Sequence, residues 1–376
     1  MTDWSKLVKP SLVGVDPYDP GASLSELMER YDLDEIWKLN WNEHLFGPFD
    51  GVLEAAHAEL ENAWQYPEKA YADFREAVAQ WTGTVPRRVV PAHGIQALVT
   101  TVAAAFIRPG DRVVVPKPTY GLYATVCAAA GAEVVRVPVR DDFGLDLEAM
   151  ATAAHEGSAR LVWVVDPNNP TGSLVAAGEW EAFLDALPEG CVTVVDEAYR
   201  EYVAPERQLE RERDVEAGRP LLLLRTFSKI FGLAGLRLGY AIANEELASY
   251  LNVVQEPFNV NRAALAAGRA SLRRPEIVEE RRVEAAAARD LLARLLREAG
   301  MEPLPSEANF LLVGLGVDDV ALADLLLRRG FLIRPGSEFG LPGYARITVG
   351  PEPVMERVVA EIVRARAEIV AAARTR

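Results

Sequence analysis

The 376-residue sequence is poor in features that mark several classes of protein. It has two cysteines and four histidines without metal-ligand spacing, so we expect neither a disulfide framework nor a metal site. No apolar run approaches membrane-spanning length, and the first residues lack the basic and apolar regions of a signal peptide, which predicts a cytoplasmic protein without a membrane partner. The formal net charge of -15 argues against nucleic acid as a partner, because phosphate backbones bind basic surfaces.

The composition and the hydrophobic pattern indicate a globular α/β protein. Hydrophobic residues make up 50% of the chain and charged residues 25%, as in ordinary soluble domains. Apolar runs typical of strands, such as RVVVP at 112–116 and LVWVV at 161–165, alternate with segments of helical periodicity such as 95–106. This alternation predicts a mostly parallel sheet with helices on both faces.

The pattern changes in the second half of the chain. Residues 245–272 and 275–300 are predicted to form long helices, and short strands and helices follow as in an α+β unit. We therefore expect a boundary near residue 275. The predicted domains are an N-terminal arm with part of a small domain at 1–45, a large domain at 46–274 and a small α+β domain at 275–376.

Four consecutive leucines, 221–224, predict a strand buried on both faces, and they lead to Lys229. A lysine between this strand and Ile230-Phe231 is partly desolvated, which disfavours the ammonium and leaves an amine that can attack a carbonyl. An isolated lysine at a strand end more commonly extends its charge into water. The reactive interpretation therefore depends on the other strand ends.

Polar clusters follow three successive predicted strands. The strand at 161–165 leads into Asp166 to Gly172, the strand at 191–195 into Asp196 to Tyr199, and the leucine strand into Ser228-Lys229. Each cluster alone is compatible with turn or helix-cap chemistry. Because open α/β sheets bind ligands at the carboxyl ends of their strands, the three clusters together predict one active site.

Five motifs in order carry a family resemblance: PTYGLY at 118–123, NNPTG at 168–172, DEAY at 196–199, TFSKIFGLAGLRLGY at 226–240 and RITVG at 346–350. From about Asn40 to Gly350 the chain resembles the fold-type-I aminotransferases that use pyridoxal 5'-phosphate, and most closely the histidinol-phosphate aminotransferase-like proteins. The resemblance implies a large domain with a mostly parallel seven-stranded sheet between helices, plus a smaller α+β domain.

The resemblance also implies how the cofactor ring is held. Lys229 would bond covalently to the cofactor aldehyde and later carry a proton as the catalytic residue. Asp196 would pair with the pyridinium nitrogen and keep it protonated. Asn169 and Tyr199 would hydrogen-bond the ring oxygen, and Tyr120 would stack on the ring face.

The same resemblance implies a phosphate site at a helix N-terminus, where backbone amides bind anions. Five residues would form it: Ala92, His93, Thr226, Ser228 and Arg237. The side-chain role of His93 stays open. Tyr66 matches a tyrosine that reaches the phosphate from the partner subunit in similar proteins, which implies a homodimer with its sites at the interface.

Substrate contacts are implied at Arg346, which would hold the α-carboxylate or its substitute as a bidentate fork, and at Arg334, Asn309, Asn42 and Asn169. A structural ion pair is the alternative role for Arg346. Relatives acting on histidinol phosphate usually carry a tyrosine where this chain has Phe46. Because Phe46 has no hydroxyl to offer a substrate phosphate, an ordinary or specialised 2-amino acid is the expected substrate.

We therefore expect an aminotransferase of amino-acid biosynthesis that moves an amino group between a small-molecule 2-amino acid and a 2-oxo acid in a ping-pong cycle. Histidinol-phosphate aminotransferase and amino-acid decarboxylase activity on the same scaffold are the alternatives. A cofactor-sensing transcriptional regulator is opposed by the acidic charge and by the lack of a basic DNA-binding segment before residue 50.

Overall fold

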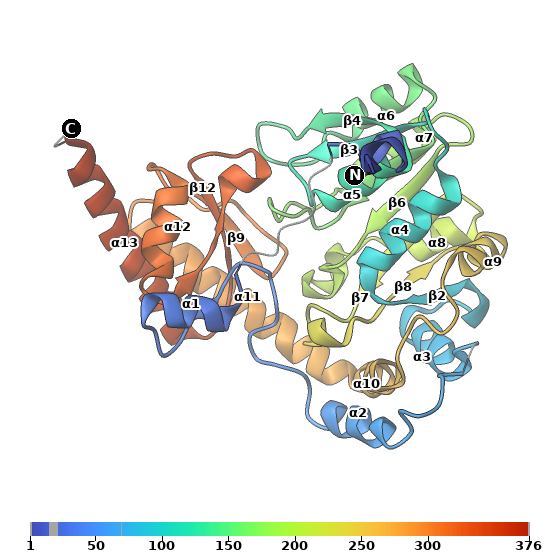
Figure 1. The fold of residues 1–376 in the computed structure, drawn as a ribbon, viewed down its shortest axis with the longest axis horizontal. Helices are drawn as coiled ribbons and strands as arrows, with labels where there is room; N and C mark the ends of the chain where they lie inside the picture. The colour runs from blue at the N-terminus through green and yellow to red at the C-terminus, as the bar shows by residue number, and fades with distance from the viewer. Residues whose placement is uncertain (1, 15–21, 69, 375–376) are drawn as a thin grey trace.

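A computed structural model describes residues 2–14, 22–68 and 70–374 (Figure 1). Residues 15–21 of the predicted N-terminal arm lie outside the described part. The centre of the fold is a seven-stranded sheet in the order β2-β8-β7-β6-β5-β3-β4. Its strands are β2 (Val89–Ala92), β3 (Arg112–Lys117), β4 (Glu133–Pro138), β5 (Leu161–Val165), β6 (Val192–Asp196), β7 (Leu221–Thr226) and β8 (Gly239–Ile242). β8 runs antiparallel to β2 and β7, and all other strand pairs in this sheet are parallel, which confirms the predicted mostly parallel sheet.

Helices cover both faces of this sheet (Figure 1). The four leucines of β7 contribute side chains to the hydrophobic cores on both of these faces. Leu222 and Leu224 pack into the core beneath α4 (Gly94–Phe106), α5 (Leu122–Ala130) and α9 (Glu245–Val254). Leu221 and Leu223 belong to the core on the opposite face, with α6 (Leu147–Glu156), α7 (Ala177–Ala186) and α8 (Arg211–Glu216). Since side chains alternate along a strand, an all-leucine run can serve two cores at once.

A second core lies beside the main sheet, around two small sheets. One has the order β11-β12-β9, and the other pairs β1 with β10. The elements are β1 (Trp37–Lys38), β9 (Phe310–Gly314), α12 (Asp319–Leu327), β10 (Phe331–Leu332), β11 (Arg334–Pro335), β12 (Tyr344–Thr348) and α13 (Glu352–Arg374). The pairing of Trp37 with Phe331 joins the N-terminal segment to the C-terminal unit.

The first residues of the chain contact a helix of the main sheet. Ser11, in the short helix η2 (Pro10–Leu12), donates a hydrogen bond to the carbonyl of Ala129 in α5 at 2.8 Å. Further on, α1 (Leu24–Tyr31) lies beside the second unit, at the opposite end of the molecule in Figure 1. α2 (Val52–Leu60) and α3 (Ala72–Thr82) pack against α10 (Arg262–Leu272), below the main sheet.

One helix serves both cores. α11 (Pro275–Glu298) contributes Val278 and Ala285 to a core of the main sheet, and Leu292 and Leu296 to the core of the second unit. A 24-residue helix is long enough to bridge two packing units. The domain division at residue 275 stays a prediction.

Two predicted elements differ from the structure. The helix predicted at 245–272 is interrupted, because α9 ends at Val254 and α10 starts at Arg262. Pro257 lies in the gap, and Asn261 caps α10 by accepting the amide hydrogen of Ala264 at 2.8 Å. The strand predicted at 331–335 is divided between two sheets as β10 and β11.

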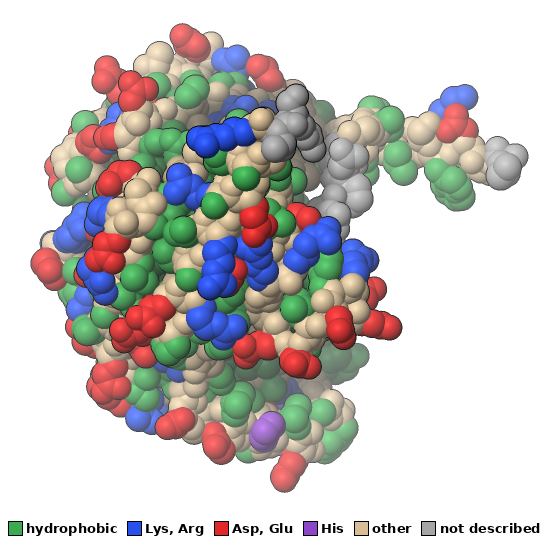
Figure 2. All heavy atoms as spheres, turned by 90° about the vertical axis from the view of Figure 1, so that its left-hand side faces the viewer, with side chains coloured by type: hydrophobic (Ala, Val, Ile, Leu, Met, Phe, Trp, Pro, Cys, Tyr) green, Lys and Arg blue, Asp and Glu red, His purple; other side chains and the backbone are tan. Residues whose placement is uncertain are grey.

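The charged surface carries mixed signs. Figure 2 shows basic and acidic side chains interspersed over the face formed by the second unit. Ion pairs at the end of α12 account for part of this mixture: Arg328 pairs with Asp324 of α12 at 2.9 Å, and Arg329 pairs with Glu368 of α13 at 2.7 Å. Among the described residues, no helix combines the length and apolar character needed to cross a bilayer.

A buried ion-pair network joins the ends of three central strands. Arg211 in α8 donates to Asp166 after β5 at 2.5 Å and to Glu197 after β6 at 2.9 Å. Arg225 in β7 bonds to Glu197 at 2.7 Å and to Glu212 at 2.7 Å. Burial would raise the pKa of Glu197, but the guanidinium groups of Arg225, Arg200 and Arg211 outweigh it and hold this pKa at about 2.

Replacing Arg211 with Met should destabilise the fold by about 3 kcal/mol, because Asp166 and Glu197 would lose their shared buried cation. Arg213→Ala is the matched control: Arg213 lies in the same helix and pairs with Glu210 at 2.5 Å, but its side chain is 78% exposed. This control should cost less than about 1 kcal/mol. Urea-induced unfolding of both variants measures the difference, and equal losses would contradict the structural role of the network.

Candidate active site

A cavity of about 1220 Å³ opens at the carboxyl ends of the central strands, next to the second unit. Val165, Asp196 and Thr226, the last residues of β5, β6 and β7, line it. The second unit supplies Arg334 from β11 and Arg346 from β12. The cavity brings together most of the predicted site residues, namely Asn42, Tyr120, Asn169, Asp196, Tyr199, Thr226, Ser228, Lys229, Arg237, Arg334 and Arg346.

Three cofactor residues proposed from the sequence lie outside the cavity lining. Ala92 is buried at the end of β2, and His93 is the N-cap of α4 without a side-chain capping bond. Both would act through backbone amides at the start of that helix. Tyr66 is 78% exposed and stacks on Phe258 with ring centroids 4.8 Å apart, so within one chain it does not reach the cavity.

Two substrate expectations need correction. Asn309 does not line the cavity; its Nδ2 donates to the carbonyls of Asn42 at 3.1 Å and Glu43 at 3.3 Å, so it positions the chain that does. Phe46 is not among the lining residues either, and its ring lies 5.3 Å from that of His44. Its missing hydroxyl therefore carries no argument against a phosphorylated substrate within one chain.

Lys229 extends its amine toward the chain segment before α2. Its Nζ donates hydrogen bonds to the carbonyl oxygens of Trp41 at 2.9 Å and Asn42 at 3.0 Å. Desolvation, reinforced by the guanidinium of Arg346, lowers the pKa of Lys229 to about 7. The amine can therefore exchange a proton near neutral pH, as an acid-base group or a nucleophile requires.

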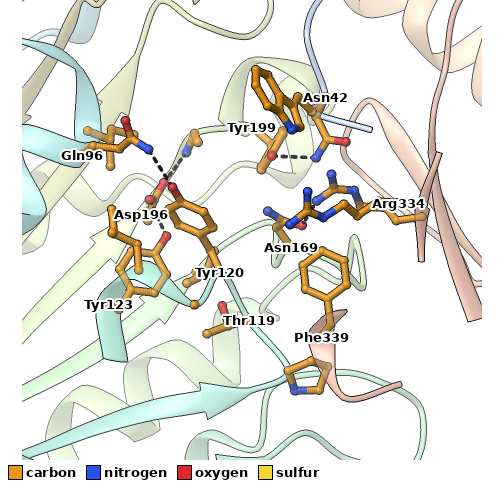
Figure 3. A pocket seen from close by; sticks show the side chains of 18 of the residues that line it. Asn42, Gln96, Thr119, Tyr120, Tyr123, Asn169, Asp196, Tyr199, Arg334 and Phe339 are labelled. Atoms are coloured by element: carbon orange, nitrogen blue, oxygen red, sulfur yellow. Dashed lines mark hydrogen bonds between the residues drawn. The ribbon is translucent and has the colours of Figure 1, made fainter. Parts of the chain in front are cut away.

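Asp196 is a buried carboxylate with two hydrogen-bond donors. The Tyr123 hydroxyl donates to its Oδ2 at 2.6 Å, and the amide of Ala198 donates to its Oδ1 at 2.9 Å (Figure 3). Burial raises the pKa of Asp196 to about 6, whereas both donors act to lower it. Tyr123 in turn stacks on Trp163, with ring centroids 4.7 Å apart.

Arg237 and the start of α4 form a second polar end of the cavity. Arg237 donates to Gln96 Oε1 at 3.0 Å, and Gln96 Nε2 donates to the Tyr120 hydroxyl at 2.8 Å. A Cβ atom on Gly94 would lie 2.9 Å from the guanidinium of Arg237, and Gly94 has a φ of +77°, so this position requires glycine. Amides at a helix N-terminus next to a guanidinium can bind an anion.

The opposite end of the cavity is built on Arg346. Its Nη1 donates to Asn169 Oδ1 at 2.5 Å, its Nη2 donates to the carbonyl of Asn40, and its guanidinium lies 5.3 Å from the ring centre of Phe339. Arg334 lies at the same end of the cavity, near Asn169 and Phe339 (Figure 3), and it pairs with Glu338. This end can bind an anionic substrate group through planar guanidinium donors.

Asn42 and Tyr199 connect these two ends. Asn42 Nδ2 donates to the Tyr199 hydroxyl at 2.9 Å (Figure 3), and Asn42 has a left-handed φ of 56°. Burial raises the pKa of Tyr199 to about 12, so its phenol keeps its proton at neutral pH. No group of three or more His, Cys, Asp or Glu side chains in the described residues is arranged to hold a metal ion.

Sequence reasoning missed Tyr123 and Gln96. Tyr123 stands inside the PTYGLY motif and lies in the first turn of α5, whereas Tyr120 precedes the N-cap Gly121. Membership of that motif was the available signal for Tyr123. A buried tyrosine and an exposed glutamine are otherwise read as packing and surface residues.

A model of the family aminotransferase class I and II matches residues 34–362, so the chain belongs to that family and is a pyridoxal-phosphate-dependent aminotransferase. It is 37% identical to the histidinol-phosphate aminotransferase of Symbiobacterium thermophilum, covering 94% of this chain and 96% of that protein. It is 38% identical to that of Geobacillus thermodenitrificans, covering 93% and 96%.

The fold agrees with this family assignment. The crystal structure of histidinol-phosphate aminotransferase from Sinorhizobium meliloti in complex with pyridoxal-5'-phosphate superposes with a TM-score of 0.86 at 28% identity. The match covers 96% of this chain and 97% of that one. The predicted family and fold class are therefore confirmed.

Tyr123→Phe should shift the acid limb of the activity profile to higher pH by about one to two units, since a hydrogen bond to a charged group contributes roughly 1.5–3 kcal/mol. Removing the donor raises the pKa of Asp196 above about 6, so the carboxylate becomes protonated earlier as the pH falls. The measurement is kcat/KM against pH. Tyr202→Phe removes another buried hydroxyl, near His44, and should leave the acid limb of the profile at the same pH as in the wild type. An equal shift of the acid limb in both variants would contradict the role of the Tyr123 hydroxyl at Asp196.

Proposed function

We propose that the cavity binds pyridoxal phosphate and uses it to move an amino group from a donor with an anionic group, histidinol phosphate being the first candidate, to a 2-oxo acid. The observation that carries the proposal is the convergence of Lys229, Asp196 and Arg237 on one cavity. They supply an amine, a carboxylate and a guanidinium, which match the aldehyde, the ring nitrogen and the phosphate of the cofactor.

The fit extends to the shape of the cavity. The Gly94 backbone lies so close to Arg237 that a Cβ atom would come within 2.9 Å of the guanidinium, and the hydroxyl groups of Thr226 and Ser228, which also line the cavity, lie 2.9 Å apart. Asp196, buried and held by Tyr123, would keep its negative charge against the ring nitrogen. Once bound, pyridoxal phosphate supplies an electron-withdrawing ring that makes a proton on the substrate carbon labile.

Lys229 would move that proton. With a pKa of about 7, its amine can take up a proton from the substrate carbon and return one at low energetic cost. The carbonyls of Trp41 and Asn42 hold the amine by two hydrogen bonds and thereby orient it. Tyr199 stays a neutral phenol and can donate a hydrogen bond to the ring oxygen.

Arg346 would bind the anionic group of the donor. Its hydrogen bonds to Asn169 and to the carbonyl of Asn40 orient the guanidinium plane. The N–H donors that a carboxylate or phosphate would bind are therefore already oriented before the donor arrives. Arg334, paired with Glu338, stands at the same end.

The similarity to histidinol-phosphate aminotransferases supports histidinol phosphate as the donor, and within one chain Phe46 does not line the cavity. A screen of amino donors and 2-oxo acids with product identification tests this choice. Release of an amine and carbon dioxide would instead favour the decarboxylase alternative. The cytoplasmic location and the absence of a nucleic-acid partner stay predictions.

Lys229→Ala should abolish turnover by at least about a thousandfold and remove the visible absorbance of the bound cofactor, because both depend on the amine of Lys229. Absorbance spectra and steady-state rates with histidinol phosphate measure these effects. Lys117→Ala, which removes a lysine at the cavity rim, should keep the absorbance. An unchanged spectrum in Lys229→Ala would refute the assigned role.

We further propose a homodimer in which Tyr66 reaches the phosphate end of the partner's cavity. Tyr66 is 78% exposed, and Trp64 and Leu60 beside it are 80% and 56% exposed. On α9, Val253 is 83% exposed. Exposed apolar side chains of this size favour association with another protein surface.

Purified heterodimers of one Tyr66→Phe chain and one Lys229→Ala chain test the shared site. At limiting cofactor, Tyr66→Phe alone should bind pyridoxal phosphate about tenfold more weakly, since a hydrogen bond to a charged group is lost. The heterodimer should recover about half of the wild-type rate, because one of its two sites would be complete. Tyr250→Phe, another exposed tyrosine, is the control; a heterodimer no more active than Tyr66→Phe would contradict the arrangement.

A further inference from the structure

Gln96 is an exposed residue in the first turn of α4 that lines the active-site cavity. Its Oε1 accepts a hydrogen bond from Arg237 Nη2 at 3.0 Å. Its Nε2 donates a hydrogen bond to the Tyr120 hydroxyl at 2.8 Å (Figure 3). One side chain therefore connects the guanidinium at the phosphate end of the cavity with an aromatic ring of the cavity wall.

The two neighbours of Gln96 fix the orientation of its amide group. A guanidinium has only donors, so the amide must present its oxygen to Arg237 and its NH2 group to Tyr120. Because both ends belong to one amide group, a contact that orients the oxygen also orients the NH2 group. The position of the Arg237 guanidinium consequently decides which hydrogen bond the Tyr120 hydroxyl receives.

Arg237 can bind an anion without giving up Gln96. Its Nη1 donates to the carbonyl of Ala234 at 3.0 Å, and its Nη2 donates to Gln96. These bonds use two of the five N–H donors of the guanidinium, and the others are available to an anion at the start of α4. Such an anion would reduce the motion of the guanidinium, and with it the motion of the Gln96 amide.

The contacts continue from Tyr120 to the carboxylate of Asp196. Tyr120 meets Tyr123 edge to face, with ring centroids 5.6 Å apart and ring planes at 85° (Figure 3). The Tyr123 hydroxyl donates to Asp196 Oδ2 at 2.6 Å. Tyr123 and Asp196 are buried, whereas Gln96 is exposed and has a long side chain with much rotamer freedom to lose. Gln96 is therefore the member of this series that a bound anion can order.

We propose that Gln96 is a positioning residue that makes the two halves of the cofactor site cooperative. An anion at Arg237 orders the Gln96 amide, and the amide in turn orders Tyr120 against the pyridine ring of the cofactor. A ring that binds to the ordered site loses less conformational entropy, so it binds more tightly. By linkage, the bound ring increases the affinity for the anion by the same factor. This inference rests on the proposed function and adds to it a coupling between phosphate binding and ring binding.

The test divides the cofactor into two separate ligands. Inorganic phosphate supplies the anion, and pyridoxine supplies the ring without an aldehyde, so no bond to Lys229 forms. The full-length enzyme is freed of cofactor, and a fluorescence titration measures the Kd of pyridoxine with saturating phosphate and with sodium chloride of equal ionic strength. The unfolding temperature, and the visible absorbance that returns when pyridoxal phosphate is added, show that each variant is folded.

In the wild type, phosphate should tighten pyridoxine binding about fivefold, as expected for coupling through one neutral hydrogen bond. Gln96→Met keeps the side-chain length without the amide, and Tyr120→Phe keeps the ring without the hydroxyl. Each should reduce the factor to below about twofold, and the double variant should lose no more than either single one, because both changes remove the same connection. Thr100→Ala, an exposed change one turn further along α4, is the control and should keep the wild-type factor.

Three results would contradict this coupling or its basis. The same factor in Gln96→Met as in the wild type, or no effect of phosphate in the wild type, overturns the role of Gln96. Weaker binding of both ligands with an unchanged factor also overturns it, because Gln96 would then only stabilise the site. A wild-type enzyme that binds no pyridoxal phosphate contradicts the proposed function instead.

Discussion

The guanidinium of Arg211 bonds to Asp166 after β5 and to Glu197 after β6, and all three side chains are buried. These bonds fix the two strand ends relative to each other. Asn169 follows Asp166 by three residues, and Asp196 immediately precedes Glu197, so the same contact positions two groups of the cavity. Because removing one partner would leave a buried charge uncompensated, the network makes any displacement of these loops unfavourable.

Asp196 and Glu197 show how adjacent carboxylates acquire different properties. Glu197 joins the arginine network, which holds its pKa at about 2, whereas Asp196 lines the cavity, where burial raises its pKa to about 6. Side chains of successive strand residues point to opposite faces, so one position stabilises the sheet and the next serves the site. The hydroxyl of Tyr123 opposes the effect of burial and favours the charged form of Asp196.

The cavity depends on contacts between segments far apart in the sequence. Lys229, after β7, bonds to the carbonyls of Trp41 and Asn42, whose segment is anchored through Leu39 in the core of the second unit. Arg346 in β12 bonds to Asn169 in the loop after β5. Lys229, Trp41 and Arg346 therefore share one cavity only when both units are packed together, and movement between the units would alter the site.

The sequence by itself determined the sheet and most of the chemical groups, because an all-apolar run such as residues 221–224 is typical of a doubly buried strand, and a polar motif after such a strand reaches the carboxyl edge of the sheet. The five motifs in order determined the family. The hydrophobic pattern of a short segment does not predict structure that depends on contacts with residues far away in the sequence. Pro257 lies in the gap between two helices that the pattern predicted as one. The strand β8 has only four residues and overlaps the end of a longer motif, so the hydrophobic pattern did not predict it. Only the tertiary structure brought Tyr123 to Asp196, left Phe46 outside the lining of the cavity within one chain and brought the backbone carbonyl of Trp41 to Lys229, since burial and proximity depend on the packing of the whole chain.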